Sequence, residues 1–444
     1  MKTLHRRRFI QTRALAGAAG MGGLVASLGL AWALVAQASH VAIERRGEGW
    51  RLYRDEEPIL LRGAVGWSRF DALAAAGANA VRVGAQRQHL DQAGRFGLGA
   101  LVGLPLGLPR VGFDYTDAAK VANQRERIRQ LVLELKDHSS VWLWAIGNEP
   151  TIFATPQQRE TLWKEVNRIA EMIHSLDAHH PVITVVGGEQ WKEHLGELDA
   201  FCPDLDAVGI NAYADMLSLP EALARQGWKR PYLITEFGPR GHWQVERNAW
   251  KARLEDHSTA KADFYRQAYE HAVKDRPQCL GSFAFLWGWK MEKTHTWYGM
   301  FLEDGSRTAA VDVMTHLWQG RWPTNRCPLL APVAVTIAAT EGGARGDVGT
   351  FRPGEILQVR VSVSDPEADA LNVTWDLRRD VADDPRVGGD HEPLEPPIAG
   401  AVLESSGERA RLRLPSSPGR YRVFVYVRDP HGGAATANVP LLCQ

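Results

Sequence analysis

Eight short apolar segments alternate with helix-like segments between residues 59 and 286, and this alternation limits the fold more than any other feature. Residues 141–146 have almost no polar position, as expected of a parallel strand that is buried on both faces. Residues 125–138 instead repeat apolar side chains with the period of a helix. Strands are predicted at residues 59–63, 79–83, 99–103, 141–146, 182–186, 205–210, 232–235 and 280–286.

Eight strand–helix units over about 260 residues predict an α/β fold, a closed (β/α)8 TIM barrel. An open doubly wound sheet is the alternative. It is disfavoured because no glycine-rich phosphate-binding loop follows the first strand.

The pattern changes after Trp318. A linker is expected over residues 321–334 and a small all-β domain over residues 335–444. Short alternating segments such as Tyr421 to Val427, separated by turn residues, are typical of a β-sandwich. This part of the chain resembles polycystic-kidney-type and other immunoglobulin-like modules, which commonly accompany secreted glycosidases.

The N-terminus has the layout of an export signal. Arg6, Arg7 and Arg8 precede residues 14–43, which contain no Asp, Glu, Lys or Arg, and a small-x-small cleavage site ends at Ala38. Residues 1–38 therefore predict a twin-arginine-type signal peptide and a periplasmic or secreted protein, with the barrel domain over residues 39–320. An uncleaved anchor in the inner membrane is the alternative, because about 20 apolar residues can span a bilayer.

Composition excludes several classes of partner. The 52 Lys and Arg residues balance 52 Asp and Glu residues, so nothing favours a nucleic acid. The four cysteines are scattered without metal-ligand spacing, and we expect no metal and no cofactor. The 16 tryptophans suit stacking on sugar rings, but they also suit a large core.

Two of the predicted strands end in a glutamate. Asn148 and Glu149 follow the fourth strand, and Glu236 ends the seventh. One such glutamate would more often cap the next helix. A pair facing one barrel mouth suits glycoside cleavage, which needs one protonated and one ionised carboxyl group.

The segments 144–150 and 232–238 resemble the corresponding motifs of the clan A glycoside hydrolases. The chain is most similar to the barrel domain of glycoside hydrolase family 2, from about residue 41 to 320, and its opening residues 50–63 are similar to the start of that barrel. The resemblance implies retention of anomeric configuration, with Glu149 as general acid/base and Glu236 as nucleophile. Retention requires the two carboxyl groups to lie about 5–5.5 Å apart.

The same resemblance implies further roles at the barrel mouth. Asn148 is expected to bind the sugar 2-hydroxyl, Arg82 to keep the nucleophile ionised, and Tyr213 to hydrogen-bond it. Trp287 is expected to form the aromatic floor of the sugar site, although Trp289 could do so instead. The substrate-binding residues predicted are Arg82, Asn148, Asn211, Tyr213, Trp287, Trp289 and Trp67.

These features predict an exported β-glycosidase that cleaves β-linked oligo- or polysaccharide. Family 2 enzymes usually carry β-sandwich domains before the barrel. Here only about twenty residues separate the signal from the first strand, which favours an open cleft for a polysaccharide, with the loop 237–261 as a wall. A transglycosylase at the same site and a non-catalytic carbohydrate-binding or exopolysaccharide-assembly protein are the alternatives. The sugar, its linkage and the oligomeric state are left open.

Overall fold

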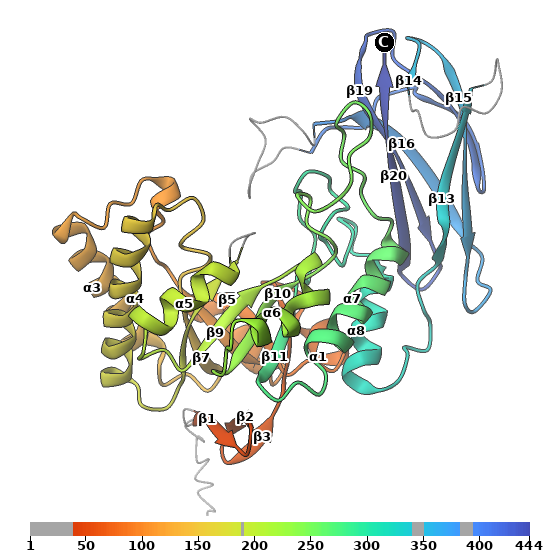
Figure 1. The fold of residues 1–444 in the computed structure, drawn as a ribbon. Helices are drawn as coiled ribbons and strands as arrows, with labels where there is room; N and C mark the ends of the chain where they lie inside the picture. The colour runs from red at the N-terminus through yellow and green to blue at the C-terminus, as the bar shows by residue number, and fades with distance from the viewer. Residues whose placement is uncertain (1–38, 188–190, 340–349, 382–393) are drawn as a thin grey trace, which may run out of the picture. The chain divides into compact units, whose positions relative to one another are not determined.

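The computed structural model describes residues 39–187, 191–339, 350–381 and 394–444 (Figure 1). The predicted signal, residues 1–38, lies outside this part of the chain. Among the described residues, no helix has the length and apolar character needed to cross a membrane.

A small antiparallel sheet precedes the barrel. It consists of β1 (Val41–Arg46), β2 (Gly49–Arg54) and β3 (Glu57–Ile59). Val41 and Leu52 are buried in one cluster with Trp142 and Leu143 of the barrel interior. This sheet therefore closes the end of the barrel opposite the mouth.

The eight central strands form a closed parallel barrel, which confirms the predicted fold class. They are β4 (Leu61–Val65), β5 (Ala80–Gly84), β6 (Gly99–Leu104), β7 (Val141–Ile146), β8 (Val182–Val186), β9 (Ala207–Asn211), β10 (Tyr232–Phe237) and β11 (Cys279–Ala284). Each strand pairs with its neighbour in sequence, and β11 closes the circle by pairing with β4. The segment predicted as one strand over residues 59–63 is divided at Leu60 between β3 and β4.

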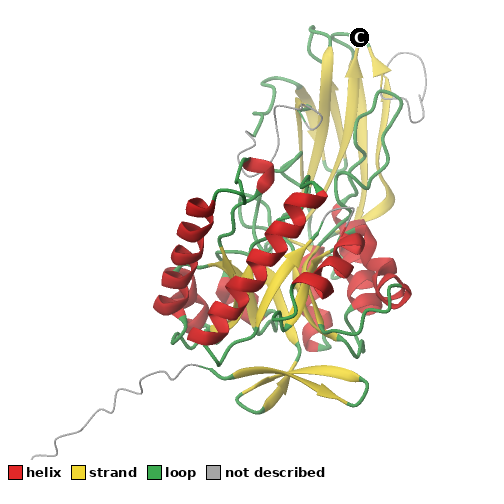
Figure 2. Cartoon of the chain, turned by 60° about the vertical axis from the view of Figure 1, so that its left-hand side comes forward, coloured by secondary structure: helices red, strands yellow, loops and turns green. Residues whose placement is uncertain are grey.

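Helices flank the barrel strands, as Figure 2 shows. They are α1 (Phe70–Ala75), α2 (Arg87–Arg95), α3 (Ala118–Leu135), α4 (Pro156–Leu176), α5 (Trp191–Phe201), α6 (Leu219–Arg225), α7 (Ser258–Ala272) and α8 (Ala309–Gln319), with short 3₁₀ turns η1 (Pro109–Val111) and η2 (Ala214–Ser218). Capping side chains define where the two longest helices, α3 and α4, begin. Asp117 caps α3, and Thr155 and Gln158 form a reciprocal capping box at α4.

Two further sheets, one mixed and one antiparallel, contain the strands after the barrel. One contains β12 (Arg307–Thr308), β20 (Gly433–Cys443), β19 (Gly419–Arg428) and β16 (Asn372–Arg379), with β14 (Thr350–Phe351) also paired to β20. The other contains β13 (Leu329–Ala339), β15 (Ile356–Ser364), β18 (Arg409–Arg413) and β17 (Val402–Ser406). Strand β13 begins inside the segment 321–334, so the linker is shorter than expected.

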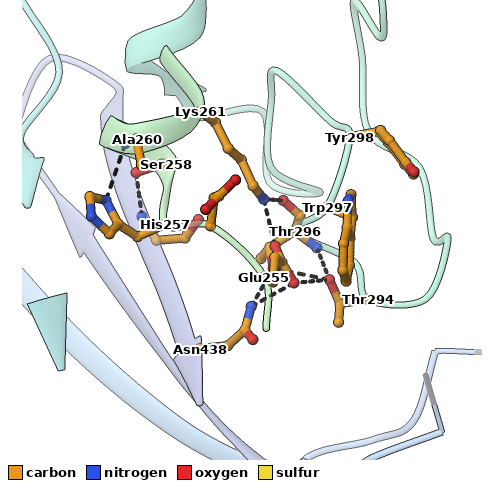
Figure 3. Close-up of polar contacts among 12 residues, drawn as sticks. Glu255, His257, Ser258, Ala260, Lys261, Thr294, Thr296, Trp297, Tyr298 and Asn438 are labelled. Carbon is orange, nitrogen blue, oxygen red and sulfur yellow. Dashed lines mark hydrogen bonds and ion pairs between the residues drawn. The ribbon is translucent and has the colours of Figure 1, made fainter. Parts of the chain in front are cut away.

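The barrel and the sandwich share a buried polar cluster (Figure 3). Glu255 accepts hydrogen bonds from Lys261 at 2.5 Å, Thr294 at 2.5 Å, Thr296 at 2.9 Å and Asn438 of β20 at 2.7 Å. Burial raises the pKa of Glu255, but Lys261 and these hydrogen bonds outweigh it and hold the pKa below its ordinary value. The hydrogen bond between Asn438 and Glu255 thus joins the sandwich to the segment before α7.

Candidate active site

Glu149 lies immediately after β7 in an uncommon backbone conformation. Its φ is 48°, in the left-handed region, and its carbonyl accepts a hydrogen bond from Arg110 at 2.6 Å. A Cβ atom on Gly187, after β8, would lie 2.0 Å from Oε1 of Glu149. The position of the Glu149 carboxyl group therefore requires a glycine at residue 187.

Glu236, on β10, has a donor for each carboxylate oxygen. Arg82 of β5 donates to Oε1 at 2.8 Å, and the Tyr213 hydroxyl donates to Oε2 at 2.9 Å. The side chain of Glu236 is 12% exposed and that of Arg82 is 9% exposed. Both oxygens of this carboxylate are thus held by charge-assisted hydrogen bonds.

Glu149 has a different environment. Burial is the largest influence and the charge of Glu236 the next, and together they raise the pKa of Glu149 to about 7. A hydrogen bond from Asn211 to Oε1, at 3.0 Å, opposes this rise in pKa. Near neutral pH, Glu149 can therefore hold a proton.

Asn211, at the end of β9, joins the two carboxyl groups. Its amide nitrogen donates to Glu149 and, also at 3.0 Å, to Oδ1 of Asn148. Its Oδ1 accepts from Thr235 at 2.8 Å and from Arg82 at 3.4 Å. Hydrogen bonds thus connect Glu149 to Glu236 through two side chains, Asn211 and Arg82.

Asn148 is exposed, and its amide has a fixed orientation. Oδ1 accepts from Arg82 at 2.7 Å as well as from Asn211. Because these donors take the oxygen, the amide nitrogen is the group that Asn148 can offer to a ligand.

The predicted aromatic residues are in three different places. Trp287 is 1% exposed, packs against Phe301 and Trp318, and donates to the Arg69 carbonyl at 3.1 Å. A sugar platform needs an exposed ring face, so the structure does not support Trp287 as the floor. Trp289 lines a separate hollow together with residues of the sandwich, and Trp67 is 54% exposed.

Phe285 is the aromatic residue beside the candidate site that the sequence interpretation missed. It follows β11, is half-buried, and lies with its ring centre 6.1 Å from that of Tyr213. Trp243 of the loop after β10 lies 5.3 Å from Tyr213 on the same measure. The predicted loop 237–261 therefore contributes an aromatic neighbour to the residue that binds Glu236.

The loop that carries Trp243 is held by hydrogen bonds. Gln244 accepts from Ala214 at 2.9 Å, and the His242 backbone donates to the Tyr298 hydroxyl at 3.0 Å.

Within the part of the chain that the structure describes, no group of three or more His, Cys, Asp or Glu residues is arranged to hold a metal ion.

Part of the barrel sequence matches a family model. Residues 112–254 match the family model described as glycosyl hydrolases family 2, TIM barrel domain. This segment of the barrel is therefore similar to the barrel domain of glycosyl hydrolase family 2. The matched segment includes Glu149, Asn211, Tyr213 and Glu236.

Solved structures of β-glucuronidases also resemble the chain. The enzyme from Bacteroides uniformis is 13% identical with a TM-score of 0.46, and the match covers 91% of this chain and 48% of that one. The enzyme from Faecalibacterium prausnitzii is 19% identical with a TM-score of 0.48, and the match covers 64% of this chain and 52% of that one. The chain thus spans about half the length of these structures, and likeness at this level adds nothing to the fold already described. No curated protein matches the sequence significantly.

Proposed function

We propose that the chain is a retaining β-glycoside hydrolase acting on β-linked oligo- or polysaccharide, with Glu149 as general acid/base and Glu236 as nucleophile. The single observation that carries the proposal is the difference between the two carboxyl groups. Glu236 is held by Arg82 and Tyr213, whereas burial and the charge of Glu236 raise the pKa of Glu149 to about 7. Glycoside cleavage requires this division between an ionised and a protonated carboxyl group.

In the first step, the Glu236 carboxylate attacks the anomeric carbon. The glycosidic carbon–oxygen bond breaks, and the leaving oxygen takes the proton of Glu149. The product is a glycosyl ester on Glu236. Tyr213 donates to Oε2 of Glu236, and burial keeps the pKa of Tyr213 well above its ordinary value, so its hydroxyl group keeps its proton.

In the second step, the ionised Glu149 takes a proton from water. The water oxygen attacks the anomeric carbon, the ester bond breaks, and Glu236 is released as a carboxylate. Two inversions at one carbon give net retention. The amide nitrogen of Asn148 is available to the sugar 2-hydroxyl during both steps, because Arg82 and Asn211 hold its oxygen.

Export is the remaining part of the proposal, and it rests on the sequence of residues 1–38, with Arg6 to Arg8 ahead of an uncharged apolar segment. Detection of the chain in the periplasm or medium, and its loss when Arg7 and Arg8 are changed to Lys, tests this part.

The chemistry is tested by trapping the intermediate. Aryl β-glycosides of several sugars identify the preferred one, and its 2-deoxy-2-fluoro analogue with a good leaving group should label the protein with one glycosyl group. Digestion and mass spectrometry should find the label on Glu236, and the Glu236→Gln variant should stay unlabelled. Label on another residue, or product of inverted configuration by proton NMR, would contradict the proposal. Transfer to an added sugar in place of water would identify a transglycosylase at the same site.

A further inference from the structure

A cleft of about 530 Å³ borders the candidate active site. It lies at the ends of β5, β6 and β7, and it shares Arg82 and Asn148 with the site. Its charged lining residues are Arg82, Arg110 and Arg127, and no described Asp or Glu is among them. The chain as a whole has 52 basic and 52 acidic residues, so this concentration of positive charge is local.

The three arginines differ in the groups that they contact. Arg82 forms an ion pair with Glu236 at 2.8 Å. Arg110 donates to the backbone carbonyl of Glu149, and Arg127 is exposed on α3. For neither Arg110 nor Arg127 does the structure, over the residues it describes, place a carboxylate within ion-pair distance. The charge of Arg110 opposes the rise in the pKa of Glu149, and both Arg110 and Arg127 line the cleft.

Arg110 is held in place before any ligand arrives. Arg110 belongs to η1. The loop segment before η1 is joined at Gly107 to residues that follow η1 in the chain. The Gly107 backbone donates to Gln124 of α3 at 2.5 Å, and the Tyr115 hydroxyl donates to the Gly107 carbonyl at 2.7 Å. A cation held in this way loses little conformational freedom when it binds an anion.

The rest of the cleft suits the ring of a sugar. Leu104, Leu106, Leu108 and Leu131 contribute apolar surface, and Gln86 and Asn148 contribute amide groups. Apolar walls with a few placed polar groups are typical of small-molecule sites. Guanidinium groups bind carboxylate and sulfate oxygens with paired hydrogen bonds.

We propose that this cleft binds a saccharide unit carrying an anionic substituent, carboxylate or sulfate, through Arg110 and Arg127, and that the substrate is an anionic β-linked polysaccharide. The inference rests on the proposed function, because the cleft has this meaning only if Glu149 and Glu236 cleave the bound chain.

The test compares matched substrates. A β-linked oligosaccharide containing uronic acid, the same oligosaccharide after reduction of its carboxyl groups, and a 6-sulfated form of the reduced oligosaccharide are each assayed for kcat/KM. We expect the wild-type chain to prefer an anionic form by about tenfold or more, because a charge-assisted hydrogen bond is about twice as strong as a neutral one. The uronate and sulfate arms distinguish the two anions.

Variants of Arg127 give the clearer test, because Arg110 also donates a hydrogen bond to the carbonyl of Glu149. Arg127→Gln should lower kcat/KM on the preferred anionic substrate about tenfold and leave the reduced one unchanged, and Arg127→Glu should lower it further. Arg95→Gln, the same change at an exposed arginine of α2 outside the cleft, is the control and should change neither rate.

Equal kcat/KM on charged and neutral substrates would overturn the inference and leave the proposed function standing. So would a preference that both Arg127 variants keep. If the chain hydrolyses none of these substrates and no aryl β-glycoside, the proposed function fails and the inference fails with it.

Discussion

Arg82 reaches Glu236 directly at 2.8 Å but is joined to Glu149 only through Asn211. The same guanidinium group also donates to Asn148 at 2.7 Å and to the Thr235 carbonyl at 3.0 Å. One side chain therefore stabilises the ionised carboxylate and orients the amide that faces the ligand.

Replacing Arg82 with Gln should consequently reduce kcat/KM on an aryl β-glycoside by about a hundredfold or more, since the ionised form of Glu236 loses its cation. Steady-state kinetics measure the loss, and thermal unfolding shows whether the fold is retained. Arg51→Gln, at an exposed residue of β2, is the control and should retain full activity. A folded Arg82→Gln variant with normal kcat/KM would remove Arg82 from the site.

The pKa of Glu149, about 7, predicts the alkaline side of the pH profile. The first step needs Glu149 protonated, so kcat/KM should fall as pH rises above about 7. Glu149→Gln should abolish this fall on a substrate whose leaving group needs no proton, such as a dinitrophenyl glycoside. The same variant should lose most activity on a substrate with a poor leaving group. An unchanged alkaline limb in Glu149→Gln would assign the titration to another group.

The same shift in pKa has a consequence for stability. Glu149 has a higher pKa in the folded chain than its ordinary value of 4.5, so the folded state keeps the proton to a higher pH. Its contribution to the unfolding free energy is therefore present below about pH 4.5 and lost as pH rises through about 7. Glu149→Gln should stabilise the chain at pH 8 by about 2 kcal/mol and have little effect at pH 4. Urea unfolding at the two pH values measures this, and equal effects at both would contradict the burial of the charge.

Gly187→Ala tests the position of Glu149 without altering either carboxylate. The added Cβ would overlap Oε1 of Glu149 at 2.0 Å, so the acid must move. We expect kcat/KM to drop about tenfold or more on substrates with poor leaving groups, and less on activated ones, which do not need the proton. Gly196→Ala introduces a methyl group with no neighbour within 4 Å, at a glycine that like Gly187 has no positive φ, and controls for the loss of a glycine. Equal losses on both classes of substrate would indicate general misfolding.

Glu255→Gln should destabilise the joint between barrel and sandwich. The change keeps the size of the side chain but leaves Lys261 buried without its ion pair, which costs about 3 kcal/mol in comparable sites. Denaturant unfolding measures the loss. Glu270→Gln, which breaks the exposed pair with Arg266, should cost less than about 1 kcal/mol. Combining Glu255→Gln with Lys261→Met should recover stability, and failure to do so would show that the ion pair is not the cause.

The barrel was predictable because strand periodicity is local. Each predicted strand overlaps an observed one, and the glutamates at two strand ends follow from the rule that parallel strands present their carboxyl ends at one face. The exception at Leu60 arises where β3 ends and β4 begins, and one apolar run covers both.

The aromatic part of the site was not predictable in the same way. Residues 285–289 contain Phe285, Trp287 and Trp289, and the sequence does not say which ring faces Tyr213. The structure puts Phe285 there, whereas Trp287 packs against Phe301 and Trp318. The cluster at Glu255 was missed because Asn438 lies 183 residues further along, and no periodicity links the two.

The two residues of β12 pair in parallel with Gly433 and Ala434 of β20, immediately before α8 completes the barrel. The two residues that lead into α8 are therefore hydrogen-bonded to the last strand of the chain. The sandwich therefore cannot be exchanged for another domain without loss of contacts that the barrel uses. A barrel truncated at residue 320 would expose the unpaired edge of β12 and the polar side chains around Glu255, so shortened or chimeric chains need to keep both parts from the same parent.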